Sequence, residues 1–343
     1  MFLALKDLKN ARGRFGLMAT ATGLITLLLV MLTGLTGGLG AQNTSALEAI
    51  GVKDDTRFVF NSEKPSFTDS QFSTDEVLAD TIPLGTAQTR LEVDDTAVGV
   101  AVLGLPEGEL IPGTSVHVPA DGIVLPDELS DEVPALKEGS WVTAGGVDVQ
   151  VAGMADTLHY AHSPVAWTST KTWAKISHAG KDAAGTVLLG SDGVNPPESM
   201  TATDTKGAFE GLEAYKSERS SLTTMQGFLY AISALVTIAF LSVWTVQRTR
   251  DMAILRALGA TSGYLFKDSL GQAAIVLAVG TALGAVVGAA LGFLVQGTVP
   301  FELNYLTVVL PAVGIFVLGM AGALLAVRQV KSADPMAILG GTA

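Results

Sequence analysis

The feature that most limits how this chain can fold is a set of four long stretches without any charged residue. They cover residues 15–47, 220–247, 269–301 and 303–327. A helix needs about 20 apolar residues to cross the hydrocarbon core of a bilayer, and each stretch is longer than that. Buried core helices of a soluble protein do not explain four such runs. The sequence therefore predicts a membrane protein with four transmembrane helices.

Lysine and arginine give these helices a direction. Ten basic residues flank the spans in three groups, which are Lys6, Lys9, Arg12 and Arg14, then Arg248, Arg250, Arg256 and Lys267, then Arg328 and Lys331. Cytoplasmic loops are enriched in such residues, and all three groups lie on one side if both termini are cytoplasmic. We therefore expect a multi-pass protein of the plasma membrane. A cleaved signal peptide is the alternative for the first span, but the apolar run is too long for one.

These features predict a linear plan of eight segments. The expected fold class is four transmembrane α-helices plus a mixed α+β extracytoplasmic domain between the first and second helix. The segments are a cytoplasmic amphipathic helix at 1–15, transmembrane helix 1 at 16–40, the extracytoplasmic domain at 41–219, transmembrane helix 2 at 220–247, a cytoplasmic coupling loop at 248–268, transmembrane helix 3 at 269–297, transmembrane helix 4 at 303–327 and a cytoplasmic tail at 328–343.

Short alternating runs separated by turns indicate mixed secondary structure in the extracytoplasmic domain. Alternation of apolar and polar residues is typical of strands, and glycines between two such runs indicate a hairpin. The candidate elements are a strand at 96–103, a hairpin formed by 141–143 and 147–151 around Gly145 and Gly146, and helices at 127–136 and 168–176.

The charge and residue content of this domain exclude several functions. It holds 11 Lys and Arg against 28 Asp and Glu, which leaves no basic patch for nucleic acid. The chain has no Cys, so disulfides and thiolate metal sites are excluded. His159 and His162 flank Tyr160 at a spacing that could hold a metal. Pro164 indicates a loop there and no acid lies nearby in sequence, so structural or surface histidines are the favoured interpretation.

Glycine recurs at every fourth position of the third span. The residues are Gly280, Gly284, Gly288 and Gly292. This spacing places a smooth groove along one face of a helix, against which another helix can pack closely. Packing against a helix of the same chain is the favoured interpretation, and contact with a second copy is the alternative.

The loop between the second and third spans carries the most specific motif. It reads QRTRDMAILRALGAT over residues 247–261. Met252, Leu255 and Leu258 recur at helical spacing, and Gly259 acts as a stop. A short amphipathic helix at this place offers a docking surface for a cytoplasmic partner. A helix on the membrane surface without a partner is the alternative.

This motif resembles that of the FtsX/MacB superfamily of permeases, the type VII ABC transporters, whose loop has the form R-x-x-E-x-x-x-L-R-A-x-G-A. The chain has Asp251 where the family has Glu, and residues 333–339 resemble the family's closing D-P-x-x-A-L. The resemblance implies a homodimer in membrane lipid with two ATPase subunits docked below, and mechanotransmission through the first and second helices. The implied ATPase-coupling residues are Arg248, Arg250, Asp251, Leu255, Arg256 and Gly259.

The chain has no nucleotide-binding motif of its own. No G-x-x-x-x-G-K-[ST] occurs in the sequence, and that loop is what cradles the phosphates of ATP. The chain is therefore expected to be a non-catalytic permease subunit with no intrinsic cofactor. The resemblance implies that a separate ABC ATPase subunit binds and hydrolyses ATP.

A second, shorter match suggests a cargo. Residues 157–167, TLHYAHSPVAW, resemble a stretch of the HrtB-like haem exporters and the DevC-like exporters. Haem is flat, apolar and anionic, so its site needs an iron ligand and apolar walls at the membrane edge. The candidates are Glu210 as iron ligand and Phe209 as wall, followed by Tyr230, Met225, Tyr160 and Glu213. Glu210, Glu213 and Ser217 are expected near one helical face, where a symmetric dimer would present paired carboxylates.

Each candidate also has a purely structural interpretation, and other cargoes fit the same architecture. Glu210 and Glu213 can be solvated stalk residues, Tyr230 can be interfacial or packing, and Met225 can be apolar filling. An exporter of peptide, antibiotic, lipid or lipoprotein needs no iron ligand. A relative that signals to a cell-wall enzyme and an extracytoplasmic sensor are the non-transport alternatives.

Overall fold

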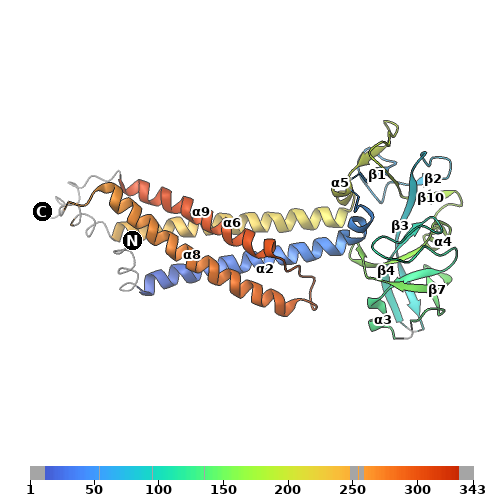
Figure 1. Cartoon of the computed structure of the whole chain (residues 1–343), viewed down its shortest axis with the longest axis horizontal. Helices are drawn as coiled ribbons and strands as arrows, with labels where there is room; N and C mark the ends of the chain where they lie inside the picture. The colour runs from blue at the N-terminus through green and yellow to red at the C-terminus, as the bar shows by residue number, and fades with distance from the viewer. Residues whose placement is uncertain are drawn as a thin grey trace. The chain divides into compact units, whose positions relative to one another are not determined.

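The computed structural model describes residues 12–53, 55–94, 96–134, 136–247, 254 and 259–331. It divides into two compact units (Figure 1). The helical unit is built within residues 1–38 and 221–343, and the sheet domain is Leu39–Ser220. Residues 1–11 of the predicted amphipathic helix, residues 248–253 and 255–258 of the coupling loop, and residues 332–343 of the tail lie outside the described residues.

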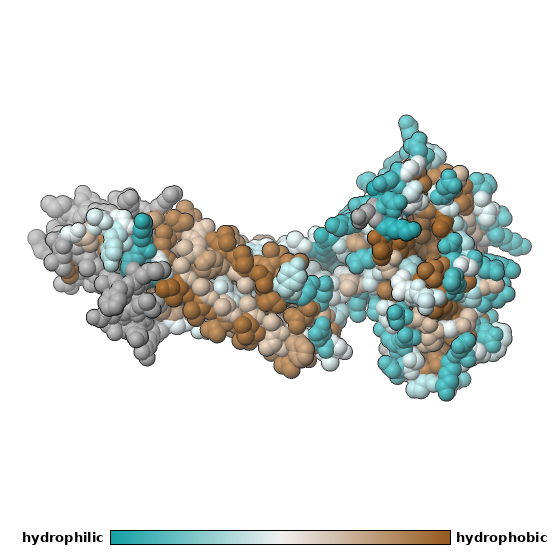
Figure 2. Space-filling view, viewed as in Figure 1, coloured by the Kyte–Doolittle hydropathy of each residue, from teal (hydrophilic) through white to brown (hydrophobic). Residues whose placement is uncertain are grey.

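Four long helices confirm the predicted fold class. They are α2 (Arg12–Ile50), α6 (Glu213–Gln247), α8 (Ser262–Val295) and α9 (Tyr305–Lys331). Each contains a segment long and apolar enough to cross a membrane, namely Phe15–Ile50, Glu213–Phe240, Gly263–Val295 and Tyr305–Ala326. The surface of these helices is largely apolar and that of the sheet domain largely polar (Figure 2). All four helices run past their predicted bounds, because α2 continues to Ile50, α6 begins at Glu213, α8 begins at Ser262 and α9 continues to Lys331.

The glycine stripe of α8 packs against α2 of the same chain, which confirms the favoured interpretation. A Cβ on Gly280 would lie 2.7 Å from the carbonyl oxygen of Ala19, and one on Gly284 would lie 2.2 Å from that of Gly23. At Gly288 the nearest atoms belong to Val30, at 3.0 Å. Only residues without a side chain let the two backbones approach this closely.

The sheet domain contains a ten-stranded mixed sheet with the order β12-β1-β11-β3-β4-β9-β5-β7-β6, in which β8 pairs with β9. The strands are β1 (Arg57–Phe60), β3 (Ile82–Val93), β4 (Thr96–Leu105), β5 (Ile123–Pro126), β6 (Trp141–Ala144), β7 (Val147–Ala155), β8 (His159–Tyr160), β9 (Ser163–Ser169), β11 (Val187–Gly190) and β12 (Thr201–Thr203). β2 (Phe72–Ser73) and β10 (Ala183–Gly185) form a separate pair. β4 with β9 and β5 with β7 run parallel, and the other pairs are antiparallel.

One extra pairing closes part of the sheet on itself. Leu91 of β3 pairs with Ala144 of β6, so that β3, β4, β9, β5, β7 and β6 form a closed circuit. The predicted hairpin at 141–151 is confirmed, since β6 and β7 pair antiparallel around Gly145 and Gly146. Both glycines have positive φ, at 55° and 77°, which is what a tight turn of this kind requires.

Three short helices complete the domain, α3 (Glu128–Glu132), α4 (Thr170–Ile176) and α5 (Thr205–Phe209). α3 and α4 lie inside the two predicted helical patches. Trp173 of α4 lies across β3 and β4, where a Cβ on Gly85 would come within 2.2 Å of its ring and one on Gly104 within 2.5 Å of its Cβ. The two glycines thus make room for the largest side chain of the helix.

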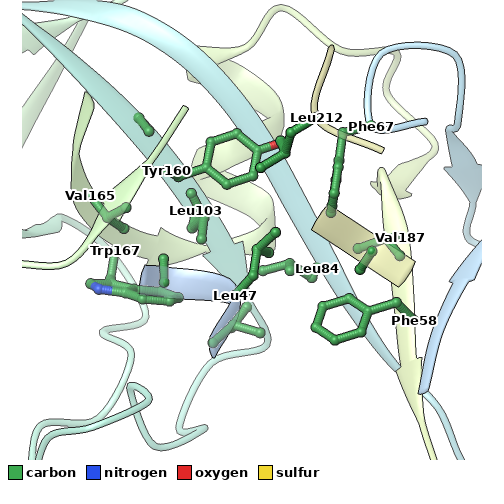
Figure 3. Packing of buried hydrophobic residues seen from close by; sticks show 14 of the residues in the cluster. Leu47, Phe58, Phe67, Leu84, Leu103, Tyr160, Val165, Trp167, Val187 and Leu212 are labelled. Carbon is green, nitrogen blue, oxygen red and sulfur yellow. The ribbon is translucent and has the colours of Figure 1, made fainter. Parts of the chain in front are cut away.

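Buried side chains gather into two main clusters within the domain. The larger one includes Leu47 of α2 and residues of the α5–α6 region as well as strand residues. Leu47, Phe58, Leu84 and Tyr160 lie close together within it (Figure 3). Burying one large apolar side chain stabilises a fold by about 1.5–3 kcal/mol. The C-terminal part of α2 and the N-terminal part of α6 are therefore packed in the core of the sheet domain.

Candidate functional site

The junction where α2 and α6 join the sheet domain contains most of the residues predicted to bind cargo. Phe209, Leu212 and Tyr215 are between 5% and 8% exposed and belong to the larger buried cluster. The rings of Phe209 and Tyr215 meet edge to face, with centroids 5.7 Å apart. The Arg219 guanidinium bonds the Tyr215 hydroxyl and lies over its ring, 5.5 Å from the centroid. The structure thus places Phe209 in the core of the domain, not on a free surface.

Glu210 and Glu213 are exposed, but they do not share a helical face as predicted. Glu210 is the C-cap of α5, and α6 begins only at Glu213. The amides of Glu210, Gly211 and Leu212 each bond the carbonyl three residues earlier, at 3.0–3.2 Å, so the chain turns here before α6 starts. The prediction of one continuous face was wrong because Gly211 separates the two helices. Neither carboxylate has an ion pair or side-chain hydrogen bond within the described residues.

Three side chains from distant parts of the sequence meet at the same junction, and we name them the clasp: Asn43, His162 and Glu218. Nε2 of His162 lies 2.8 Å from Oε1 of Glu218. Nδ2 of Asn43 donates to Oε2 of Glu218 at 3.1 Å and to the carbonyl of Leu39 at 3.0 Å. Asn43 is fully buried, so this amide is held by its partners away from water. The clasp joins α2, α6 and the β8–β9 turn.

Backbone bonds fasten the β8–β9 turn to α2 next to the clasp. The amides of Ala161 and His162 donate to the carbonyls of Asn43 and Gln42, at 3.1 and 2.9 Å. Ala161 and His162 both have positive φ, 47° and 65°. Residues other than glycine adopt this backbone conformation rarely and at a cost in free energy. Ser45 adds a hydroxyl that accepts from the amide of His159 at 2.8 Å. Three hydrogen bonds, from the amides of His159, Ala161 and His162, thus hold this turn to the helix.

The two histidines of the TLHYAHSPVAW segment point to different partners. His159 Nε2 lies 3.3 Å from Oε1 of Glu128, whereas His162 contacts Glu218. No group of three potential metal ligands occurs within the described part of the chain. The favoured interpretation of structural histidines agrees with these contacts.

Tyr160 is buried in the core of the sheet domain. Its ring meets that of Phe67 edge to face at 5.5 Å, and its hydroxyl donates to Oγ1 of Thr86 at 3.3 Å. Burial raises the pKa of its phenol above the ordinary value. A cleft of about 640 Å³ beside the junction is lined by Tyr160 and Glu213, together with Phe67, Trp173 and His178. Two of the predicted residues are thus brought to one cleft, whose lining does not include Glu210.

The two candidates within α6 are placed differently. Met225 is 55% exposed. Tyr230 packs on α9, where a Cβ on Gly314 would lie 2.9 Å from its ring, which agrees with the packing interpretation.

Of the predicted ATPase-coupling residues, Arg248, Arg250, Asp251, Leu255 and Arg256 lie outside the described residues. Gly259 has φ 99°, the left-handed conformation typical of a glycine after a helix. Thr261 then caps α8, and its hydroxyl accepts from the amide of Tyr264 at 3.3 Å. The predicted stop at Gly259 is consistent with this geometry.

Comparison with known proteins assigns the carboxy-terminal membrane part of the chain to a family of permease domains. Residues 224–335 match the family described as FtsX-like permease C-terminal. The carboxy-terminal third of this chain is an FtsX-like permease domain. The chain is similar over its whole length to bacterial ABC transporter permeases, and such a permease works with an ATPase partner.

Three relatives illustrate the similarity. A protein named hemin transport system permease HrtB, from Staphylococcus epidermidis, is 23% identical over 350 residues and covers 99% of both chains. The protein of the same name from Staphylococcus haemolyticus is 24% identical over 355 residues, again with 99% of both covered. An uncharacterised ABC transporter permease of Mycobacterium tuberculosis is 23% identical over 357 residues, also with 99% of both. The chain is thus an ABC transporter permease and a membrane protein.

One solved structure is also similar in part. The extracellular domain of YknZ, a noncanonic ABC-type transporter from Gram-positive bacteria, matches 44% of this chain and 100% of that chain, at 12% identity and a TM-score of 0.32. A score of that size does not establish a shared fold.

Sequence reasoning missed the clasp. Asn43 and His162 are 119 residues apart and His162 and Glu218 are 56 apart, so no local spacing brings them together. The signal that existed was indirect, namely one asparagine beyond an apolar span and a histidine in a segment already singled out.

Proposed function

We propose that this ABC transporter permease expels haem from the membrane. The observation that carries the proposal is the similarity over the full length to two permeases that are named for hemin transport. That similarity includes the sheet domain, which the FtsX-like family match at 224–335 leaves out. A separate ATPase subunit binds and hydrolyses ATP, and the permease chain has no intrinsic cofactor.

Two exposed carboxylates support the choice of cargo. Glu210 and Glu213 precede the apolar part of α6 and have no partner among the described residues. Haem iron takes an axial ligand from a protein side chain, and a carboxylate just before an apolar helix can supply an oxygen for it. We retain Glu210 as the proposed ligand, with Glu213 and Met225 beside the route. Tyr160, Tyr230 and Phe209 contribute through packing, since the structure buries the first and third and seats the second on α9.

We further propose that the permease works by mechanotransmission as a homodimer in the plasma membrane, with both termini in the cytoplasm. Supporting this, α2 and α6 are continuous helices of 39 and 35 residues that enter the core of the sheet domain. The clasp links the C-terminal part of α2 to the N-terminal part of α6 and links both to the β8–β9 turn. A movement of either helix would therefore be passed to the sheet through buried contacts.

The test is a haemin titration of the purified full-length chain, with absorption spectra of wild type, Glu210→Ala and Glu198→Ala. Glu198 is an exposed carboxylate of the same domain and controls for loss of charge. A saturable, shifted Soret band that weakens only in Glu210→Ala is the expected result. A spectrum no different from that of empty micelles would rule out haem as cargo and leave a peptide or lipid as the alternative for the same permease.

A further inference from the structure

A second cleft of the sheet domain lies on the other side of α4. It encloses about 1050 Å³ between α4, the turn that follows it, β10 and the loops next to β4 and β5. Clefts of roughly 300–1,000 Å³ are the usual size for small-molecule sites. The volume is therefore sufficient for a ligand well beyond a single ion.

Three lysines line this cleft in a domain that is otherwise strongly acidic. Lys171 and Lys175 lie one turn apart on α4, and Lys181 follows in the next turn. All three are exposed, and none has an ion pair or side-chain hydrogen bond within the described residues. They represent three of the 11 basic residues of a domain that also carries 28 acidic ones. Three unpaired like charges around one hollow repel each other and attract an anion.

The rest of the lining is small and mostly apolar. The alanines and prolines that contribute are Ala120, Ala174, Ala179, Ala183, Ala184, Pro83 and Pro106. Two acids, Glu107 and Asp121, and His178 also line the cleft, so three lysines against two carboxylates leave a net charge of +1 with the histidine neutral. The hydroxyl of Thr170, also on the lining, has no hydrogen-bond partner within the described residues. A complementary ligand has an apolar body and carries its negative charges along one edge.

We propose that this cleft, the lysine cleft, binds a flat apolar dicarboxylate of the porphyrin class, with the carboxylates at Lys171, Lys175 and Lys181. The biological role of this site rests on the proposed function, because the cleft would be a transient binding site for exported haem on the sheet domain. Binding here requires the two carboxylates and no metal. This separates the lysine cleft from a site at Glu210, where iron is the recognised atom.

Metal-free protoporphyrin IX is the probe, titrated into the full-length chain in lipid nanodiscs and followed by porphyrin fluorescence, with empty nanodiscs as blank. The variant is K171Q/K175Q/K181Q. The matched control is K53Q/K64Q/K137Q, three exposed lysines of the same domain that do not line this cleft. We expect the first variant to raise the Kd by about 10-fold or more, as losing charge-assisted bonds should, and the control to leave it unchanged. Protoporphyrin dimethyl ester should not compete.

Equal affinities in the two triple variants, or competition by the dimethyl ester, would overturn the inference. The outcomes also separate the two proposals. A Glu210-dependent Soret band together with lysine-independent porphyrin binding would keep haem export and reject the lysine cleft. Lysine-dependent porphyrin binding together with a haemin Soret band that Glu210→Ala leaves unchanged would keep the lysine cleft and reject Glu210 as the iron ligand.

Discussion

Tyr160 shows how a single buried residue makes the stability of the sheet domain depend on pH. Burial raises the pKa of its phenol, so the folded domain holds the neutral form. An unfolded tyrosine ionises near pH 10. The stability that this residue contributes is therefore complete below about pH 10 and is lost as the pH rises toward the folded-state pKa, by up to about 1.4 kcal/mol per pH unit.

We predict that Tyr160→Phe flattens this alkaline loss. Below pH 9 the variant should lose only about 0.5–1.5 kcal/mol, because one hydrogen bond to Thr86 disappears. Above pH 10 its unfolding midpoint should fall less steeply than that of wild type. Tryptophan fluorescence reports this domain, since Trp141, Trp167 and Trp173 lie in it. Tyr305→Phe, at a residue that is 76% exposed, is the control. Parallel slopes for all three proteins would contradict the prediction.

Glu210 marks the limit of what local spacing predicts. Its separation from Glu213 and Ser217 fits one helical face, but Gly211 lies between, and a Cβ there would lie 3.0 Å from the carbonyl oxygen of Ala208. Glycine inside a helical pattern is a known sign of a break, so this feature was accessible from the sequence. The exposure of Glu210 was also predictable, whereas the burial of Phe209 depends on strands far away in the chain.

At the scale of helices, the glycine stripe of α8 is the clearest case in which sequence spacing predicts a contact. We predict that Gly284→Ala destabilises the helical unit by about 1–3 kcal/mol, the usual effect of overpacking. The atom in the way is the carbonyl oxygen of Gly23, which belongs to the backbone and cannot turn aside. Gly271→Ala, where nothing lies within 4 Å, is the matched control and should be neutral or stabilising.

The measurement for this pair is the temperature at which half of the detergent-solubilised protein is lost from the monodisperse peak in size-exclusion chromatography. A lower temperature for Gly284→Ala alone is expected. If the two variants behave alike, close packing of α2 on α8 does not limit stability.

The clasp is a device of the element scale, because it joins two helices and a turn. We predict that Glu218→Ala and His162→Ala each lower the stability of the sheet domain by about 0.5–1.5 kcal/mol, since each removes a hydrogen bond between side chains that are about a third exposed. The double variant should cost less than the sum, with a coupling of about 0.5–1.5 kcal/mol. Tryptophan fluorescence during denaturant unfolding supplies the values. Glu213→Ala, at an exposed carboxylate without a partner in the described chain, should change little, and additive effects would argue against the clasp.

At the scale of the whole molecule, composition predicts the helices and leaves the sheet order undetermined. Four charge-free runs suffice to identify α2, α6, α8 and α9, because the thickness of a bilayer fixes the length that a span needs. The pairing of β3 with β6 joins residues about 50 positions apart, and alternation along a strand does not say which strand lies beside it. The lysine cleft could not be predicted from the sequence for the same reason, because its lining residues come from five separate segments of the chain.

The last prediction concerns the homodimer. The apolar window of α6 is 11% buried, against 28–33% for the other three candidate spans, so α6 takes the smallest part in packing within the chain. Met225, Phe228, Ile232 and Leu235 are all between 48% and 67% exposed and follow one another at steps of three, four and three residues. This spacing forms a continuous seam along a helix that can pair with its own copy. We expect α6 to meet α6 of a second chain along this seam.

Because the native chain has no cysteine, single cysteines can test this seam directly. Oxidation of membranes that contain Ile232→Cys, or cysteine at another of the four seam positions, should give a disulfide-linked dimer, which requires Cα atoms within about 7 Å of each other. Ser233→Cys is the control, since this neighbouring side chain is 1% exposed and faces the chain's own helices. Cross-linking at the exposed α8 positions Leu283 or Val286, with none along α6, would move the interface to α8.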